Sequence, residues 1–282
     1  MDVRLLGVVG LVSLDRVDGG LPRLGGAPFY AAQALRVLGH PARLVTKLAA
    51  EDSCRGLHAL GVPTAVGAAA KTISFRIEND SHGSRRLELE EPGDPWTIED
   101  ARGWVARELA GADWVHAGAL TRADFPAETL AVLARGRVLS FDGQGLVRSS
   151  SVGPVDLDAA YDPAVLRHVS VLKLSQEEAD ALGLRLDDRS LGALGVREIV
   201  VTLGGDGCVV YADGVTKLVP TRRIDVADPT GAGDQFMAGY LAYRRGGHPP
   251  TSAARLASTL VAQLLARRRD FVFHTHKVGS LL

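Results

Sequence analysis

The sequence reads VRLLGVVGLV at residues 3–12, AAQALRVL at 31–38 and ARLVTKL at 42–48. The first and third stretches are rich in Val and Leu and have the length of buried strands. The second repeats Ala and Leu at helical spacing and is closed by Gly39, a residue that commonly ends helices. A strand, a helix and a second strand joined so closely predict a βαβ unit with parallel strands.

The same alternation continues along the chain. We expect further strands at 114–117, 138–142, 169–174 and 198–203, with helices at 99–109, 128–134 and 177–182. Strands separated by helices predict an α/β fold with a mostly parallel, doubly wound sheet. At 282 residues the chain is long enough for one such domain with a small appendage. We therefore predict a single domain over residues 1–282.

Two segments depart from this alternation. Thr72–Glu78 and Arg85–Glu91 alternate apolar and polar residues around the turn-like stretch 79–84, which predicts a hairpin with one solvated face. Asp15–Gly26 is rich in turn residues and partly extended. Together these segments (about 13–26 and 72–91) predict a small β lid beside the main sheet. The alternative is a hairpin that extends the edge of the main sheet.

The composition is that of an ordinary globular protein, with 46% hydrophobic and 23% charged residues. A net charge of −1 gives no bulk attraction to nucleic acid or to anionic membranes. The apolar start runs into Asp15 and Arg16 without a small-residue cleavage site, so we expect a first strand rather than a signal peptide. We expect a soluble cytoplasmic protein in which Cys54 and Cys208 are free thiols, because their spacing fits no metal site.

The stretch DPTGAGD at 228–234 precedes a helical run at 235–244. Its glycines allow a tight turn whose amides converge at a helix N-terminus, an arrangement that binds anions. Phosphoryl transfer needs such an anion site next to a group that accepts the proton of the attacking hydroxyl. Asp234 is our candidate for that base. The alternative is that the aspartate merely caps the helix, since Asp is a favoured N-cap residue.

The sequence DPTGAGDQF at 228–236 resembles the second signature of the ribokinase-like (PfkB) carbohydrate kinases. Residues 25–32 (GGAPFYAA) are similar to the early Gly-Gly stretch of that family, and residues 201–207 (VTLGGDG) resemble its nucleotide-side strand and loop. The resemblance covers nearly the whole chain. It implies a three-layer α/β/α sandwich with a small β lid, and transfer of the γ-phosphate of ATP to a hydroxyl of a sugar, polyol or nucleoside.

The resemblance also implies roles for individual residues. Asp234 becomes the catalytic base, with Gly231, Ala232 and Gly233 as the anion hole. Asp15 matches the acceptor-binding aspartate, which can accept hydrogen bonds from two adjacent hydroxyls; its alternative role is that of a turn residue at a strand end. The paired glycines Gly25 and Gly26 would let the backbone approach the acceptor.

The nucleotide side follows in the same way. Thr202, Gly205 and Gly207 would lie along the ATP. The helix expected at 251–265 would lie near the adenine with Ser258 as a neighbour, although core packing alone also explains its pattern.

Two departures from the family pattern bear on chemistry. Tyr30 stands where the family usually has Asn, which would give the acceptor an aromatic wall in place of an amide partner. In the family's Asn-x-x-Glu element, which helps to order Mg²⁺, Ser175 replaces Asn and Glu178 is kept, so we expect retained activity with weaker metal support. Lys173, just before this element, is either a contact of the nucleotide phosphates or a solvated lysine at a strand end.

Residues 140–148 (SFDGQGLVR) resemble a segment of the family branch that includes myo-inositol kinases and archaeal nucleoside kinases. Gln144 and Arg148 are therefore candidate acceptor or phosphate contacts, with a structural salt bridge as the alternative for Arg148. With Tyr30, they favour an inositol-like acceptor over free ribose.

The implied cofactors are ATP and Mg²⁺, with a monovalent cation such as K⁺ as a further candidate, and the implied partner is a small-molecule acceptor. A homodimer is one candidate assembly. A nucleoside kinase, or a ligand-binding regulator of the same fold that has lost turnover, is the alternative function. A dinucleotide-dependent oxidoreductase is not supported, because no G-x-G-x-x-G follows the first strand, and no Walker motif is present.

Overall fold

The computed structural model describes residues 5–52, 55–79, 85–224 and 228–278, and Cys54 and most of the expected hairpin turn lie outside these ranges. Its main feature is a nine-stranded sheet with the order β14-β13-β12-β11-β9-β8-β1-β4-β5. The strands are β1 (Leu5–Gly10), β4 (Ala42–Ala49), β5 (Thr64–Ala69), β8 (Ala112–Gly118), β9 (Val138–Asp142), β11 (Val171–Ser175), β12 (Glu198–Thr202), β13 (Cys208–Ala212) and β14 (Val215–Val219). The seven strands from β5 to β12 are parallel, and β13 and β14 continue the sheet antiparallel.

The order in which the chain connects the strands indicates the edge of the sheet at which ligands would bind. From β1 the chain continues on one side to β4 and β5, then crosses to β8 on the other side and proceeds outward. In such doubly wound sheets the ligands bind beyond the carboxyl ends of the strands, near the point where the order reverses. The central strands are almost wholly buried, as expected for a parallel sheet covered on both faces.

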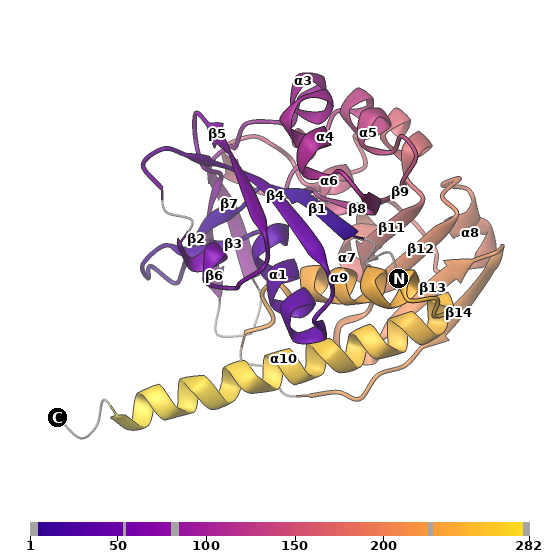
Figure 1. Ribbon diagram of the computed structural model, residues 1–282. Helices are drawn as coiled ribbons and strands as arrows, with labels where there is room; N and C mark the ends of the chain where they lie inside the picture. The colour runs from indigo at the N-terminus through magenta and orange to yellow at the C-terminus, as the bar shows by residue number, and fades with distance from the viewer. Residues whose placement is uncertain (1–4, 53–54, 80–84, 225–227, 279–282) are drawn as a thin grey trace.

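Helices cover both faces of the sheet and complete a three-layer α/β/α sandwich (Figure 1). One face carries α1 (Ala27–Leu38), α9 (Ala232–Arg245) and the long α10 (Pro250–Val278). The other carries α3 (Ile98–Arg102), α4 (Trp104–Glu108), α5 (Ala127–Leu133), α7 (Gln176–Ala181) and α8 (Asp188–Gly192). Each helical layer packs its apolar side against the sheet, so two separate hydrophobic cores form, one on each face.

A second, five-stranded sheet stands beside the main one, at the left of Figure 1. Its order is β10-β7-β6-β2-β3, with β2 (Ser13–Val17), β3 (Arg23–Gly25), β6 (Ser74–Asn79), β7 (Arg85–Glu91) and β10 (Gly153–Pro154). We call it the lid sheet. Both segments expected to form a lid are therefore in one sheet, and the alternative that the hairpin extends the main sheet is wrong.

Most expected elements occur within two residues of their predicted bounds, but α1 begins four residues and α9 three residues earlier than expected, and α10 continues to Val278, past its expected end at 265. The expected helix at 99–109 is two short helices, α3 and α4, because Gly103 between them adopts φ −90° and ψ −108°, outside the helical region. Strand β5 was not predicted, since its Ala and Gly residues have low strand propensity. Among the described residues no helix has the length and apolar character needed to cross a membrane.

Candidate active site

Two adjoining cavities open at the carboxyl ends of the parallel strands. The larger, of about 810 Å³, lies between the lid sheet and the ends of β11 and β12. The smaller, of about 320 Å³, lies between the loop after β12 and helix α10. The two share Thr202, Pro229, Ala232 and Gly233, so they meet at the turn before α9. Every site residue predicted from the sequence lines one of these cavities, with the exception of Gly25. Gly25 instead lies directly beside the carboxylate of Asp15.

The turn before α9 is built on a left-handed glycine. Gly231 is the N-cap of α9 with φ 76° and offers no side chain to the helix, so the alternative that Asp234 merely caps the helix is wrong. Gly233, two residues later, does not have a positive φ. The side chain of Asp228 accepts a hydrogen bond of 3.0 Å from the amide of Thr230 and thereby shapes the turn.

The amides of this turn are only partly available for an anion. The amide of Ala232 donates to the carbonyl oxygen of Pro229 at 3.0 Å, so it is already engaged. Gly233 and Asp234 lie in the first turn of α9, where backbone N–H groups have no intrahelical acceptor. An anion at this helix end would therefore meet the amides of Gly233 and Asp234 and the positive end of the helix dipole.

Asp234 is the third residue of α9 and is only 8% exposed. Burial and the neighbouring charge of Asp142 raise its pKa to about 7, against the opposing effect of Lys173 and Arg148. A carboxyl group with such a pKa can accept a proton and release it again near neutral pH. Buried groups with perturbed pKa values in a cleft are typical of functional sites.

Lys173 forms the positive centre of the site. Its Nζ lies 3.4 Å from Oδ1 of Asp142 and 3.9 Å from Oε2 of Glu178, and a Cβ on Gly233 would come within 3.1 Å of it. Burial alone would lower the pKa of Lys173, but Asp142 and Glu178 outweigh that effect and raise it above its usual value. The residue is 3% exposed, so the alternative of a solvated lysine is wrong. A fixed ammonium group beneath the turn suits a phosphoryl group held there.

Ser175 and Glu178 are joined in a reciprocal capping box at the start of α7. The amide of Ser175 donates to Oε2 of Glu178 at 2.8 Å, and the amide of Glu178 donates to Oγ of Ser175 at 3.1 Å. Both residues also line the larger cavity. No cluster of three or more ligating His, Cys, Asp or Glu side chains occurs in the described part of the chain. Glu178 would be the protein carboxylate that supports a Mg²⁺ ion, whose other ligands would be donor phosphates and water.

The acceptor side has its polar groups on the lid sheet and on the loop after β9. Asp15 lies within β2 and is 5% exposed, so it is not a turn residue at a strand end. A Cβ on Gly25 of the adjacent strand would overlap Oδ2 of Asp15 and crowd Oγ of Ser13, which explains the glycine there. Gln144 lines the same cavity, and its buried Oε1 has no hydrogen-bond partner in the structure. Arg148 also lines it, and its positive charge opposes the rise in the pKa of Asp234.

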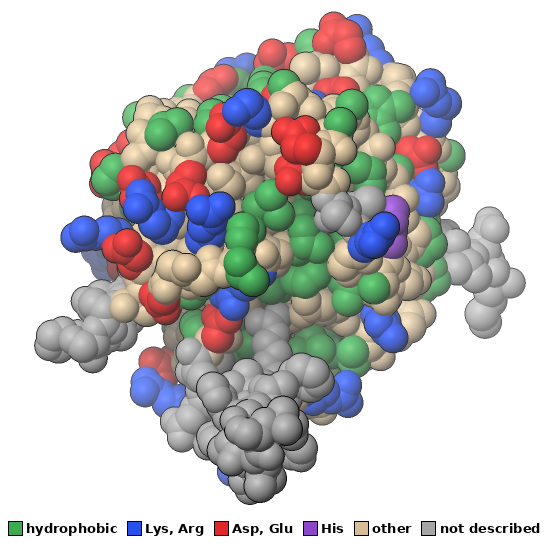
Figure 2. Space-filling view, turned by 90° about the vertical axis from the view of Figure 1, so that its left-hand side faces the viewer, with side chains coloured by type: hydrophobic (Ala, Val, Ile, Leu, Met, Phe, Trp, Pro, Cys, Tyr) green, Lys and Arg blue, Asp and Glu red, His purple; other side chains and the backbone are tan. Residues whose placement is uncertain are grey.

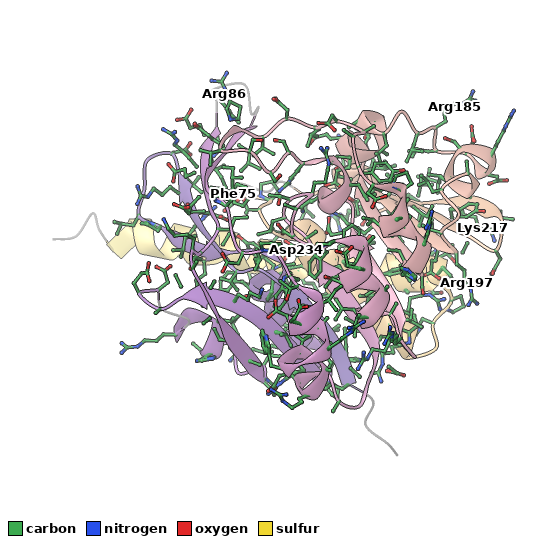
Figure 3. The ribbon with its side chains drawn as sticks, turned by 90° about the horizontal axis from the view of Figure 1, so that it is seen from above. Phe75, Arg86, Arg185, Arg197, Lys217 and Asp234 are labelled. Carbon is green, nitrogen blue, oxygen red and sulfur yellow. The ribbon has the colours of Figure 1, made fainter. Side chains whose placement is uncertain are left out.

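Sequence reasoning missed the hydrocarbon part of this cavity. Phe75, Ile77 and Leu87 of the lid sheet line it, together with Leu120, Val155 and Leu157. Figure 3 shows Phe75 and Asp234 near the middle of the molecule, and both line the same cavity. The alternation of the hairpin indicated an apolar face, but only the pairing of strands β2, β6 and β7 shows that this face turns toward Asp15.

The smaller cavity has the character of a slot for a flat, apolar group. Thr202, Gly205, Gly207 and Ser258 line it as expected from the sequence. Hydrocarbon walls come from Ile224, Phe236, Val261, Ala262 and Leu265. The hydroxyl of Ser258 donates a hydrogen bond of 3.0 Å to the carbonyl oxygen of Ala254 within α10, while the residue also lines the cavity. A nucleobase is a group of the right kind for such a slot.

Figure 2 looks onto the side of the molecule that is at the left in Figure 1. On this face acidic and basic side chains are interspersed, with hydrophobic ones gathered near the centre.

Comparison with known proteins gives a consistent result. A family model described as pfkB family carbohydrate kinase matches residues 22–270. Inositol 3-kinase from Zea mays is 34% identical over 147 residues, which cover 52% of this chain and 36% of that protein. Inositol 3-kinase from Oryza sativa subsp. japonica is 30% identical over 200 residues, which cover 67% of this chain and 48% of that protein. The matched regions thus span less than half the length of these two relatives.

Among solved structures, a pyrophosphate-dependent kinase in the ribokinase family, complexed with a pyrophosphate analogue and myo-inositol, is similar with a TM-score of 0.77. The match covers 93% of this chain and 95% of the other, at 25% sequence identity.

Proposed function

The chain belongs to the pfkB family of carbohydrate kinases, and from this premise we propose that it transfers the γ-phosphate of ATP to a hydroxyl of an inositol-like cyclic polyol. One observation carries the proposal. Asp234, buried and with a pKa raised to about 7, lies at the helix end where the larger cavity, with its polar groups, meets the smaller, mainly apolar one.

The reaction follows from the placement of these groups. Other hydroxyls of the acceptor donate hydrogen bonds to Asp15 and Gln144, and these bonds hold the reacting hydroxyl near Asp234. Its oxygen attacks the γ-phosphorus while its proton passes to the carboxylate of Asp234, and the bond from phosphorus to the bridging oxygen of ADP breaks. The amides of Gly233 and Asp234 and the ammonium of Lys173 stabilise the charge on the phosphoryl oxygens. Mg²⁺, supported by Glu178, would neutralise charge on the donor phosphates.

The donor is proposed to be ATP on the strength of the smaller cavity. Pyrophosphate needs only the anion site at the turn, whereas a slot of about 320 Å³ with hydrocarbon walls would be left unused by it. The structural neighbour described above is pyrophosphate-dependent, so its likeness does not favour ATP. The proposal of ATP rests on the smaller cavity of this chain. A nucleobase would bury its faces against Phe236, Val261 and Leu265.

The acceptor is proposed to be inositol-like because the cavity offers both hydrogen-bonding groups and a hydrocarbon surface. Asp15 suits vicinal hydroxyls, while Gln144 brings a buried Oε1 that still needs a donor. The plant relatives named above are inositol 3-kinases. A nucleoside kinase is the second candidate, because a base could lie on Phe75 while its ribose hydroxyls bind Asp15.

A matrix of donors and acceptors tests the proposal. ATP and pyrophosphate are each combined with myo-inositol, ribose, fructose, adenosine and cytidine, and phosphorylated products are followed by ³¹P NMR. We expect ATP with myo-inositol to give the highest kcat/KM, with ADP and an inositol monophosphate as products. A preference of tenfold or more for ribose, fructose or a nucleoside would refute the acceptor assignment. A preference for pyrophosphate would refute the donor assignment, and binding of ligands without turnover would favour a regulator.

A further inference from the structure

The inner face of the lid sheet changes from polar to hydrocarbon across its strands. In the parallel pairing of β2 with β6, Asp15 is opposite Phe75 and Val17 is opposite Ile77. In the antiparallel pairing of β6 with β7, Ile77 is opposite Leu87. Paired residues point to the same face of a sheet. One face therefore presents the carboxylate of Asp15 on β2 and the hydrocarbon side chains of Phe75 and Ile77 on β6 and of Leu87 on β7.

This hydrocarbon surface faces the acceptor cavity. We call Phe75, Ile77 and Leu87 the apolar strip, and all three line the cavity together with Asp15. Phe75 and Ile77 are packed into the core cluster of this face, with 3% and 2% of their surface exposed. Among the described residues of the lid sheet that line the cavity, polar side chains come only from Ser13 and Asp15 on β2.

The remaining polar groups of the cavity lie on elements outside the lid sheet. Gln144 and Arg148 belong to the loop and short helix after β9, and Asp234 belongs to α9. An acceptor whose hydroxyls bind these groups and Asp15 thus has one side against the apolar strip. On that side a hydroxyl group would lose water and gain no hydrogen-bond partner.

Inositol stereoisomers in the chair form differ in which faces of the ring carry a hydroxyl, so they can test this asymmetry of the cavity. Equatorial hydroxyls radiate from the rim of the ring, and axial groups point above and below it. In myo-inositol the single axial hydroxyl leaves one face with C–H bonds only, and in scyllo-inositol both faces carry only C–H bonds. In D-chiro-inositol the two axial hydroxyls point to opposite faces, so neither face is free of hydroxyls.

We propose that the apolar strip is an acceptor-specificity element that selects cyclic polyols having one face with C–H bonds only. This inference rests on the proposed kinase function and names the class of ring that the same site accepts. Phe75, Ile77 and Leu87 contact the C–H face, and Asp15 binds two vicinal hydroxyls at the rim.

The first test compares stereoisomers. We expect kcat/KM for scyllo-inositol within about tenfold of that for myo-inositol, and kcat/KM for D-chiro-inositol lower by about 10- to 100-fold, the range by which a hydrophobic pocket rejects an added hydroxyl. If D-chiro-inositol is used as well as myo-inositol, the inference is overturned and the kinase function stands. If no inositol is phosphorylated while ribose or a nucleoside is, the acceptor assignment and this inference both fail.

The second test changes the strip itself with a matched pair of variants. The variants are Ile77→Val and Ile77→Thr. The side chains of Val and Thr have nearly the same size and shape and both are favoured in strands, but only Thr carries a hydroxyl. We expect Ile77→Val to keep the preference for myo-inositol and Ile77→Thr to raise the ratio of kcat/KM for D-chiro-inositol to that for myo-inositol by about tenfold. Equal ratios in the two variants would overturn the inference. Leu87→Val and Leu87→Thr repeat the comparison on β7, so the test survives if one position does not tolerate change.

Discussion

The ring of Tyr30 lies against the α-carbon of Gly231, so closely that a Cβ on Gly231 would overlap the ring carbons. This contact joins the first turn of α1 to the turn that carries Asp234. Tyr30 is 6% exposed, so most of its ring supports the turn and only part of it can face the acceptor. The aromatic residue at the position where the family usually has Asn therefore has a structural role beside the predicted one.

Gly231→Ala should be strongly destabilising because two penalties combine. The left-handed backbone of Gly231 costs about 1–2 kcal/mol for a residue with a side chain, and overlap with Tyr30 adds about 1–3 kcal/mol. Gly39→Ala is the matched control, since Gly39 also has a positive φ but open space around its α-carbon. We expect Gly231→Ala to lower the free energy of unfolding clearly more than Gly39→Ala in denaturant titrations. Equal losses would show that the Tyr30 ring does not crowd this position.

The pH dependence should reveal the raised pKa of Asp234. The base must be ionised to accept a proton, so kcat/KM should rise with pH through about 7 and level off above it. A pKa that is higher in the folded than in the unfolded state also means that ionisation opposes folding. Asp234→Asn should therefore stabilise the protein at pH 8, and this gain should fade as the pH falls from about 7 to about 4. A flat activity profile between pH 5.5 and 8.5 would contradict this environment for Asp234.

The smaller cavity should be required for ATP. Ala262→Trp places an indole in the slot, and we expect it to lower kcat/KM for ATP at least about tenfold and to weaken ADP binding in calorimetry. Gln263→Trp, at an exposed position of the same helix, is the control and should change neither quantity. If both variants bind ADP like the parent, the nucleobase lies elsewhere.

The lid sheet should respond to the acceptor more than to the donor. Asp15 and the apolar strip belong to it, whereas none of its residues lines the smaller cavity. Saturation with acceptor should therefore slow hydrogen exchange of backbone amides in β6 and β7, and ATP alone should slow it less. Unchanged exchange in both strands under saturating acceptor would contradict a lid role.

The sequence alone was informative wherever a local pattern decides the structure. Runs such as Val138–Asp142 and the glycine after α1 marked the strands and the helix end because burial and backbone conformation act on neighbouring residues. The motif at 228–234 likewise identified the turn and Asp234. What could not be predicted depends on pairing between distant segments. The burial of Asp234, its charge contact with Lys173 and Asp142, and the apolar strip beside Asp15 all arise only when separate strands come together.

The central claim is that Asp234 accepts the proton of the attacking hydroxyl, and Asp234→Asn tests it most directly. Asn keeps the size of the side chain but is not basic, so kcat should fall by about 10²–10⁴ while ADP binding is retained. Asp142→Asn removes a neighbouring buried charge without removing the base, and it should cost clearly less. The measurement is kcat of the three proteins with the best acceptor at saturating ATP. Loss of kcat specific to Asp234→Asn is the predicted result, and an Asp234→Asn enzyme that keeps more than half of the parent's kcat would contradict the account.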